Sequence, residues 1–415
     1  MVILVYMKKY IVTFLSLFCL GFGICQIPIV KDTLFPRPVI HVFLEAYATN
    51  PALSQMIEFA KLPKDTKKII AWHRFPNRKN ELDLNTYNTR EVDLPAKEGH
   101  YSNGTRQMLN AVIEEAEQNP QAVFEIHGNL NHIPIVIKPF LKNLPSNKIK
   151  RIHLYEDGYG IFYKGYDNYK LPNDKSEQEI LSELKTFLNQ KTGQWQAYYE
   201  LLFYKLYPTT YHLFEPDFLY KNEKYANIIS HLKYADIQEI NFHKLRKTLS
   251  NEQKYVIYRL SGFDYHKYNK LMRGKRTFMF VFGYHFSNQT RMKAEENLLK
   301  SLYNGTSEYL KNPKSYTWFY KPHPSYSAAT GLGQIRTAFS DIIEIPAQIP
   351  FEVFILAGLK PTLTAGFSSS LFYSLYSQDV LIYVRRPGDK YQPFLTDTGK
   401  LKPEQIMTYK KFLAK

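Results

Sequence analysis

Two adjacent acids give this chain one candidate for general acid–base chemistry. Glu156 and Asp157 are followed by Gly158 at the end of a predicted strand. A neighbouring carboxylate raises a carboxyl pKa by like-charge repulsion, and a glycine lets a ligand approach the backbone closely. The motif therefore suits a general base, and an ordinary acidic turn is the structural alternative.

A histidine between two prolines gives a second candidate. His323 stands between Pro322 and Pro324, two residues after Lys321, where another predicted strand ends. The prolines stiffen the backbone around the imidazole, and the lysine adds positive charge. The motif suits a proton donor or a phosphate contact, and a rigid surface loop is the alternative.

Hydroxyl, carboxyl and imidazole groups follow other predicted strands or begin helices. Ser369 and Ser370 open a predicted helix, where they could bind an anion or simply cap the helix. Glu352 begins another helix, where it could complement the helix dipole or hydrogen-bond a vicinal diol. His132, three residues after Asn129, is by itself typical of a structural hydrogen-bonding residue.

Composition bounds the class of protein. The 415 residues are 44% hydrophobic and 22% charged, which predicts two or three domains with packed cores. The two cysteines, Cys19 and Cys25, share one apolar stretch, which excludes a disulfide framework and a cysteine-based zinc site. The formal net charge of +16 favours an acidic partner, such as nucleic acid, anionic lipid or a phosphorylated or carboxylated small molecule.

The N-terminal segment is expected to lie outside the fold. Lys8 and Lys9 precede an apolar run, and no further charge occurs before Lys31. A positive start followed by an apolar run is typical of a signal peptide or signal anchor. We expect this segment to cover residues 1–27 and a linker to cover 28–38.

Apolar strands alternate with amphipathic helices after the linker. The alternation predicts an α/β protein with two doubly wound parallel sheets, whose ligands bind at the carboxyl ends of the strands. The region from about residue 177 to 274 is predicted to be rich in helix. Predicted strands are 39–44, 68–72, 90–94, 122–127, 149–155, 277–282, 315–320, 341–345 and 380–384, and predicted helices include 51–60 and 105–117.

The order and spacing of the motifs resemble the bacterial sialyltransferases of glycosyltransferase family 80. The acid-acid-glycine turn, the His-Pro pair, the Phe-Glu-Val helix and the serine pair follow one another as in that family. Residues 43–45 with 51–56 are similar to its first strand and helix, and 207–214 resembles its inter-domain segment. The resemblance extends from about Val39 to Tyr383.

The resemblance implies a GT-B fold, with two Rossmann-like domains facing across a deep cleft. The N-terminal, acceptor-side domain is expected over 39–205 and the CMP-donor-binding domain over 206–402. A C-terminal helix over 403–415 is expected to pack back on the first domain.

The resemblance also implies roles for the motif residues. Asp157 corresponds to the general base that deprotonates the acceptor hydroxyl, and His323 to the general acid at the departing phosphate of CMP. Glu352 lies where the family holds the ribose hydroxyls. The donor-binding residues implied are Lys321, Glu352, Ser369, Ser370, His132 and Pro324. The acceptor-side residues implied are Asn129, Glu45, Glu156 and Phe286.

The implied activity is inverting transfer of sialic acid from CMP-sialic acid to a galactoside-type hydroxyl of a glycan or a glycolipid such as lipooligosaccharide. No metal or cofactor is implied, and no nucleic acid partner. The protein is expected to be membrane-associated in a bacterium, with its catalytic domains meeting cytoplasmic CMP-sialic acid.

Two alternatives stay open. One is transfer of another ulosonic acid, such as Kdo, from its CMP derivative. The other is a non-catalytic basic protein that binds acidic glycan or nucleic acid, with residues 267–276 as the nearest approach to a basic patch.

Overall fold

The computed structural model describes residues 36–45, 48–75, 78–93, 101–157, 166–190, 193–214, 216, 223–283, 289–306, 310, 312–324, 339, 341–366 and 381–383. The segments expected at 1–27 and 403–415 lie outside these residues, as do Phe286, Ser369 and Ser370. Within the described ranges, no helix combines the length and apolar character that a membrane span requires.

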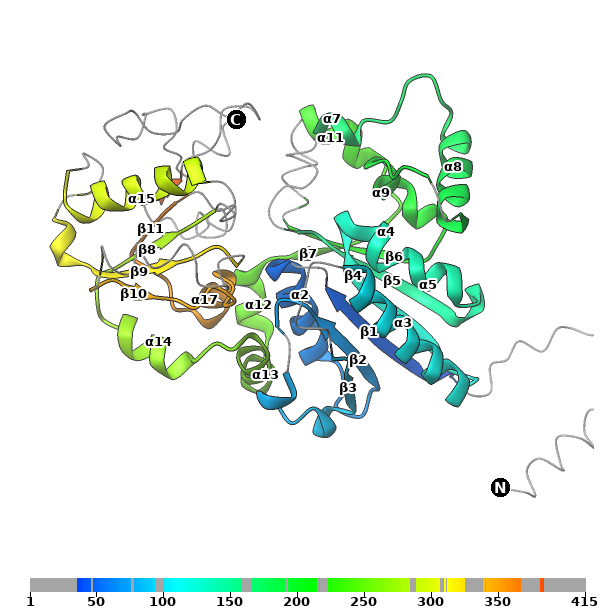
Figure 1. Cartoon of the computed structure of the whole chain (residues 1–415), viewed down its shortest axis with the longest axis horizontal. Helices are drawn as coiled ribbons and strands as arrows, with labels where there is room; N and C mark the ends of the chain where they lie inside the picture. The colour runs from blue at the N-terminus through cyan, green and yellow to red at the C-terminus, as the bar shows by residue number, and fades with distance from the viewer. Residues whose placement is uncertain are drawn as a thin grey trace, which may run out of the picture. The chain divides into compact units, whose positions relative to one another are not determined.

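The first sheet contains seven parallel strands (Figure 1). Its order is β3-β2-β1-β4-β5-β6-β7, so the order reverses beside β1. Such a reversal is where doubly wound sheets bind ligands. The strands are β1 (Val39–Glu45), β2 (Lys68–Trp72), β3 (Thr89–Glu91), β4 (Val123–Asn129), β5 (Ile149–Tyr155), β6 (Thr209–Phe214) and β7 (Asp236–Ile240).

The second sheet contains five parallel strands in the order β10-β9-β8-β11-β12. Its order reverses between β8 and β11. These two sheets confirm the predicted doubly wound parallel α/β class. The strands are β8 (Thr277–Val281), β9 (Thr317–Lys321), β10 (Ile343–Glu344), β11 (Leu363–Gly366) and β12 (Leu381–Tyr383).

In both sheets, α-helices lie in described connections between parallel strands, which need a crossover. The described helices are α2 (Thr49–Lys61), α3 (Tyr101–Gln118), α4 (Ile133–Val136), α5 (Lys138–Asn143), α7 (Tyr166–Tyr169), α8 (Glu177–Asn189), α9 (Tyr199–Leu202), α11 (Glu223–Ser230), α12 (Phe242–Thr248), α13 (Asn251–Ser261), α14 (Tyr265–Met272), α15 (Gln289–Tyr303) and α17 (Glu352–Ala357).

Strands β6 and β7 lie past residue 205, where the sequence predicts the first domain to end. The first sheet therefore takes in more of the chain than expected, up to Ile240. The region around them was predicted to be helical because amphipathic helices flank both strands. All six residues of β6 are buried, so its run of threonines and aromatic residues fits an internal strand.

Helix α2 is tied to the edge of the first sheet where its strands end. Met56 and Phe59 pack with Phe43 and Trp72 in one buried cluster. Gln55 Nε2 donates to the carbonyl oxygen of Leu44 at 3.1 Å, and its Oε1 accepts from Trp72 Nε1 at 2.8 Å. These bonds fix the start of α2 beside the carboxyl ends of β1 and β2.

Glycine is required at the end of β11. Gly366 has φ +136°, in the region that L side chains rarely adopt. A Cβ atom there would lie 2.0 Å from the carbonyl oxygen of Val281 on the neighbouring β8. The close approach of the two backbones therefore excludes any side chain.

A carboxyl group is buried among aromatic residues at α9. Glu200 is 2% exposed, and its Oε2 accepts a 2.7 Å hydrogen bond from the Tyr169 hydroxyl. Burial raises the pKa of Glu200 to about 8, against the opposing effect of the hydrogen bonds from Tyr169 and Trp195. In the folded protein this group therefore keeps its proton at neutral pH.

Replacing Glu200 with glutamine should stabilise the protein at neutral pH. The unfolded carboxyl loses its proton near pH 4.5, whereas the folded group keeps it to about pH 8, so wild-type stability falls as pH rises between these values. We expect Glu200→Gln to be more stable than wild type at pH 7.5 by about 4 kcal/mol. The gain should shrink to well under half of that at pH 5, as measured by urea unfolding at both pH values. An equal gain at both would contradict a neutral folded carboxyl.

Candidate active site

Polar side chains lie where four parallel strands of the first sheet end. Glu45 ends β1, Asn129 ends β4, and Asp157 follows β5 by two residues. Arg74 lies two residues after the end of β2. The carboxyl ends of parallel strands share one edge of the sheet, which brings residues from distant parts of the chain together.

Glu45 is a buried structural link at this edge. Its side chain is fully buried, its Oε1 accepts from the backbone N–H of Ala48 at 2.5 Å, and its Oε2 accepts from the N–H of Arg74 at 3.0 Å. Burial raises the pKa of Glu45 to about 8, and the charge of Asp157 acts in the same direction. The residue expected on the acceptor side thus holds the loops after β1 and β2.

Asp157 and His132 interact electrostatically. Both side chains are partly exposed, His132 at the start of the short helix α4. Burial lowers the pKa of His132, and the negative charge of Asp157 opposes this effect. The structure therefore brings together three residues that the sequence predicted separately, Asp157, His132 and Glu45.

The two adjacent acids have different surroundings. Glu156 is fully buried, and its Oε2 accepts a 2.8 Å hydrogen bond from the N–H of Phe214. Its own N–H donates to the carbonyl oxygen of His212, which continues the pairing of β5 with β6. Asp157 is partly exposed, so it is the acid of the pair that a substrate can reach.

Lys321 stabilises the loop that carries His323. It ends β9, is 3% exposed, and donates from Nζ to the carbonyl oxygens of Ala347 at 2.7 Å and Pro322 at 2.5 Å. Burial lowers its pKa to about 7; Glu352 opposes this effect, and Arg74 adds to it. The ammonium group predicted to contact the nucleotide thus binds the backbone that follows β9 and the backbone that follows β10. His323, two residues after Lys321, is partly exposed.

Glu352 is linked to helix α2. It begins α17 and is 1% exposed. With its amide nitrogen facing α17, Asn50 of α2 donates to both carboxylate oxygens of Glu352, each at 3.0 Å. Glu352, which the sequence predicts to hold ribose hydroxyls, therefore also connects two helices. These are α17, between strands of the second sheet along the chain, and α2, between strands of the first.

Arg74 makes the second such link, and sequence reasoning missed it. Its Nη1 donates to the carbonyl oxygen of Pro324 at 3.4 Å, next to His323. The positive charge of Arg74 acts to lower the pKa of both Glu45 and Lys321. Arg74 thus connects the surroundings of the two catalytic candidates. The available signal was its position directly after a buried strand, beside His73.

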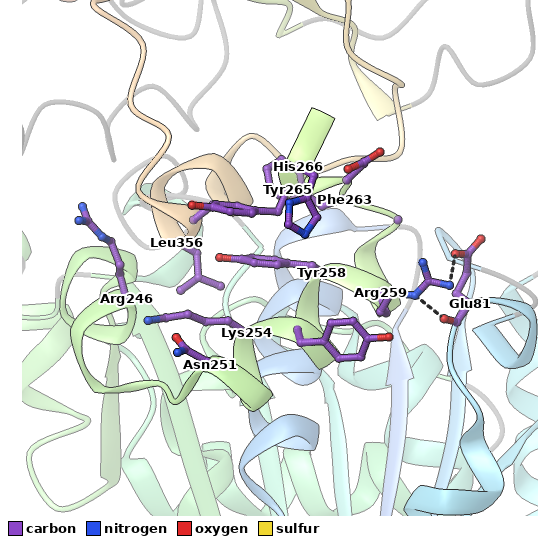
Figure 2. Close-up of a pocket in the computed structure, with 14 residues that line it drawn as sticks. Glu81, Arg246, Asn251, Lys254, Tyr258, Arg259, Phe263, Tyr265, His266 and Leu356 are labelled. Atoms are coloured by element: carbon purple, nitrogen blue, oxygen red, sulfur yellow. Dashed lines mark hydrogen bonds and ion pairs between the residues drawn. The ribbon is translucent and has the colours of Figure 1, made fainter. Parts of the chain in front are cut away.

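A cavity of about 680 Å³ lies elsewhere, along α13 and α14 (Figure 2). The rings of Tyr258 and Tyr265 stack in it with centroids 5.7 Å apart, and Arg259 Nε donates to the carbonyl oxygen of Glu81 at 2.7 Å. Of the residues predicted for catalysis or donor binding, none that the structure describes lines this cavity. The candidate active site is therefore defined by the strand ends.

Comparison with solved structures assigns the chain to the GT-B class. The sialyltransferase of Photobacterium damselae, residues 113–497 corresponding to its GT-B domain, is 22% identical with a TM-score of 0.68, over 85% of this chain and 92% of that one. An α/β-galactoside α-2,3-sialyltransferase from Photobacterium phosphoreum is 22% identical with a TM-score of 0.67, over 84% and 91%. A 2,6-sialyltransferase from Photobacterium sp. JT-ISH-224 is 21% identical with a TM-score of 0.67, over 81% and 69%.

The family follows from the sequence itself. Residues 40–387 match the model of the family described as Sialyltransferase PMO188, so the chain belongs to that family. It is a glycosyltransferase, which confirms the predicted resemblance and decides against the non-catalytic binding protein. No curated protein matches the chain.

Replacing Asn50 with aspartate should weaken the link to Glu352. The change places a second carboxylate beside a buried one, and like charges this close raise the pKa of the pair in the folded state. We expect Asn50→Asp to lower the free energy of unfolding by about 2 kcal/mol at pH 8 and by less at pH 5, where the pair can hold a proton.

Urea unfolding at the two pH values measures this effect. Asn251→Asp, on the exposed first turn of α13, is the matched control and should change stability little. A loss for Asn50→Asp that is no larger than in this control would contradict the Asn50–Glu352 link.

Proposed function

We propose that the chain transfers sialic acid from CMP-sialic acid to a galactoside-type hydroxyl, with inversion at the anomeric carbon. The observation that carries the proposal is the placement of Asp157 and His323 at the carboxyl ends of β5 and β9, with Arg74 contacting the surroundings of both. Membership of a sialyltransferase family supports it. The Photobacterium sp. JT-ISH-224 enzyme was crystallised with the donor product CMP and the acceptor lactose.

The chemistry requires a base and a group that stabilises the departing phosphate. In the proposed step, Asp157 takes the proton of the acceptor hydroxyl while its oxygen attacks the anomeric carbon. The bond from that carbon to the CMP phosphate breaks, and His323 donates a proton or hydrogen bond to the phosphate oxygen. Attack opposite the leaving group inverts the configuration, and general acid–base steps of this kind contribute about 10²–10⁴-fold to the rate.

Buried charges around the site support a role in positioning. Lys321 holds the backbone beside His323 through two carbonyl oxygens. Glu45 holds the loops near Asp157, and Asn50 orients Glu352, the residue that we propose binds the ribose hydroxyls. We propose donor-side roles also for His132 and Pro324, and acceptor-side roles for Asn129 and Phe286.

Asp157→Asn should remove turnover and keep nucleotide binding. The amide preserves the size of the side chain but cannot take the acceptor proton, whereas CMP does not depend on that proton transfer. We expect kcat to fall by at least 10²-fold and the CMP dissociation constant to change less than threefold, measured by CMP release and by calorimetry. Asp174→Asn, at an exposed position, is the control.

The same assay tests two further parts of the proposal. Run with EDTA, wild type should keep its rate, because the proposed mechanism uses no metal. Run with CMP-Kdo in place of CMP-sialic acid, it should release CMP slowly. Faster release from CMP-Kdo would favour the alternative donor, and a near-wild-type rate for Asp157→Asn would refute the base assignment.

Ser369 and Ser370 are proposed to bind the CMP phosphate. Hydrogen bonds to a charged group contribute about 1.5–3 kcal/mol each, so Ser369→Ala with Ser370→Ala should raise the donor KM by at least tenfold. Steady-state kinetics with varied CMP-sialic acid measures the change. Unchanged KM and kcat would leave these serines with helix capping alone.

We also propose that the native protein associates with the inner membrane, through its N-terminal segment or its basic surface. Attraction of a basic surface to anionic lipid is screened over about 10 Å at 0.1 M salt, whereas an inserted segment resists salt. Membrane fractions washed with 0.5 M NaCl should release the protein only in the first case. Recovery entirely in the cytosolic fraction at low salt would contradict membrane association.

A further inference from the structure

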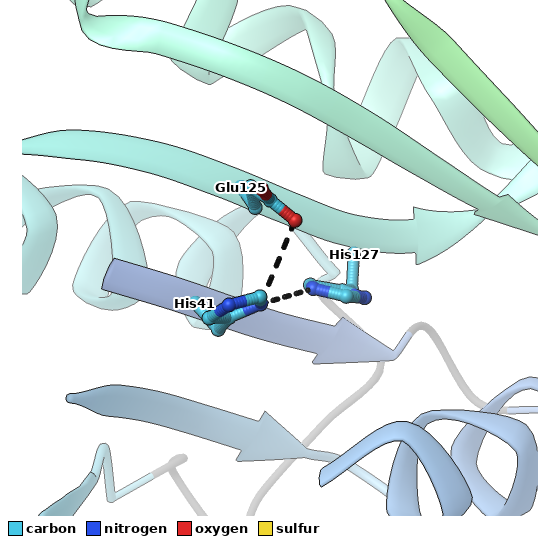
Figure 3. Close-up of side chains that lie close together, drawn as sticks. All are labelled: His41, Glu125 and His127. Atoms are coloured by element: carbon cyan, nitrogen blue, oxygen red, sulfur yellow. Dashed lines mark hydrogen bonds and ion pairs between the residues drawn. The ribbon is translucent and has the colours of Figure 1, made fainter. Parts of the chain in front are cut away.

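Two histidines and a glutamate meet on one face of the first sheet, on β1 and β4 (Figure 3). His41 Nδ1 lies 3.0 Å from His127 Nε2 and 3.9 Å from Glu125 Oε2. One potential ligand atom from each residue lies within 4.8 Å of the other two. The cluster is formed by strand interiors, four residues before β1 ends at Glu45.

Strand pairing explains why these three side chains meet. In the parallel register of β1 and β4, His41 is the partner of Glu125, and Phe43 is the partner of His127. Residues two apart on one strand point to the same face, so Glu125 and His127 both face His41. The rigid sheet therefore holds the three groups in place before any ligand binds.

Neighbouring groups orient the ring and the carboxylate. His127 Nδ1 shares a 2.7 Å hydrogen bond with the Tyr155 hydroxyl, which leaves Nε2 directed at His41. Glu125 Oε2 accepts from His153 Nε2 at 2.9 Å. The rings of His127 and His153 stack 4.2 Å apart at an angle of 4°. A second hydrogen bond on the far nitrogen is the usual arrangement of a metal-binding histidine.

The protonation states of the cluster suit a cation. Burial lowers the pKa of His41 to about 4, against the charge of Glu125, and lowers that of His127 further below its usual value. Burial raises the pKa of Glu125, but the hydrogen bonds from His153 and Lys150 outweigh it and bring the value to about 2. At neutral pH the imidazoles are thus neutral and the carboxylate is ionised, as metal ligands must be.

Two lysine side chains near the cluster carry positive charges that disfavour the binding of a metal ion. Lys150 Nζ lies 2.9 Å from Glu125 Oε1, and the charge of Lys68 also acts on His41. The Lys150 side chain is 50% exposed and can turn into solvent, whereas Glu125 Oε2 faces His41. The side chains of His41 and Glu125 are 11% and 13% exposed, which gives an ion access from that side.

We propose that His41 Nδ1, His127 Nε2 and Glu125 Oε2 bind one divalent transition-metal ion of the zinc class, with water as the fourth ligand. Two imidazole nitrogens and one carboxylate oxygen are a donor set that zinc binds in proteins. Bonds of 2.0–2.1 Å in a tetrahedron place ligand atoms about 3.3 Å apart, between the two separations found here. The ion would join β1 to β4 at the point where the strand order reverses, and it takes no part in the proposed transfer.

The test is metal binding by the purified full chain after dialysis against a chelator. Calorimetry with ZnCl₂ should give one site per chain, and zinc should raise the melting temperature. Addition of CoCl₂ should produce the visible absorption of a tetrahedral cobalt site. Neither readout depends on sialyl transfer, so failure of the proposed function would leave this result unaffected.

Variants then locate the ion. Glu125→Gln keeps the shape of the side chain, and His41→Ala removes the more exposed of the two histidines; each should weaken zinc binding at least tenfold and abolish the cobalt absorption. His266→Ala, at an exposed position on α14, is the matched control and should bind as wild type does. No stoichiometric zinc binding by wild type, or unchanged binding in Glu125→Gln, would overturn the proposal.

Discussion

The reversal of strand order beside β1 is the constraint on which the candidate active site depends. Strand β1 pairs in parallel with both β2 and β4. The crossover that follows β1 and the crossover that follows β4 therefore lie on opposite faces of the sheet. The crossovers diverge there, and polar residues at the strand ends gather at this edge, where Glu45 and Asn129 are buried and Asp157 is partly exposed. Glu45, Asn129 and Asp157 all occupy this edge.

The second feature of the candidate active site is a pair of buried ionisable groups, the acid Glu45 and the base Lys321, whose pKa values lie near neutral pH. Burial brings the pKa of Glu45 to about 8 and that of Lys321 to about 7, so both groups titrate near neutral pH. Each forms hydrogen bonds with backbone groups. The protein thus fixes its loops with polar contacts and adds little net charge where an anionic nucleotide is proposed to bind.

Much of the fold could be predicted from local patterns. The apolar run at Val39–Glu45 and the alternation of strands and helices identified β1 and the parallel class directly, because periodicity is a local property. The motif acids, Asp157 and Glu156, were predicted at a strand end, but their different surroundings were not: Glu156 is fully buried and accepts from the backbone N–H of Phe214, 58 residues away, whereas Asp157 is partly exposed.

Other features depend on contacts that no local pattern contains. The bond from Arg74 to Pro324 spans 250 residues, and Asn50 reaches Glu352 across 302 positions, 352 − 50. Strands β6 and β7 were missed because helical patterns surround them, and their place is revealed only by the pairing of β6 with β5 and of β7 with β6. Residues that position a site are therefore harder to predict than residues that perform its chemistry, because a positioning role depends on contacts with residues that are distant in the sequence.

The backbone contact at Gly366 has a consequence for protein engineering. The carbonyl group of Val281 fills the space that any larger residue would need, and the positive φ angle turns the chain as it leaves β11, three residues before the serine pair. Main-chain atoms form this contact, so substitutions of neighbouring side chains cannot make room for a larger residue at position 366. A library of variants that targets the residues after Gly366 should therefore keep this glycine unchanged.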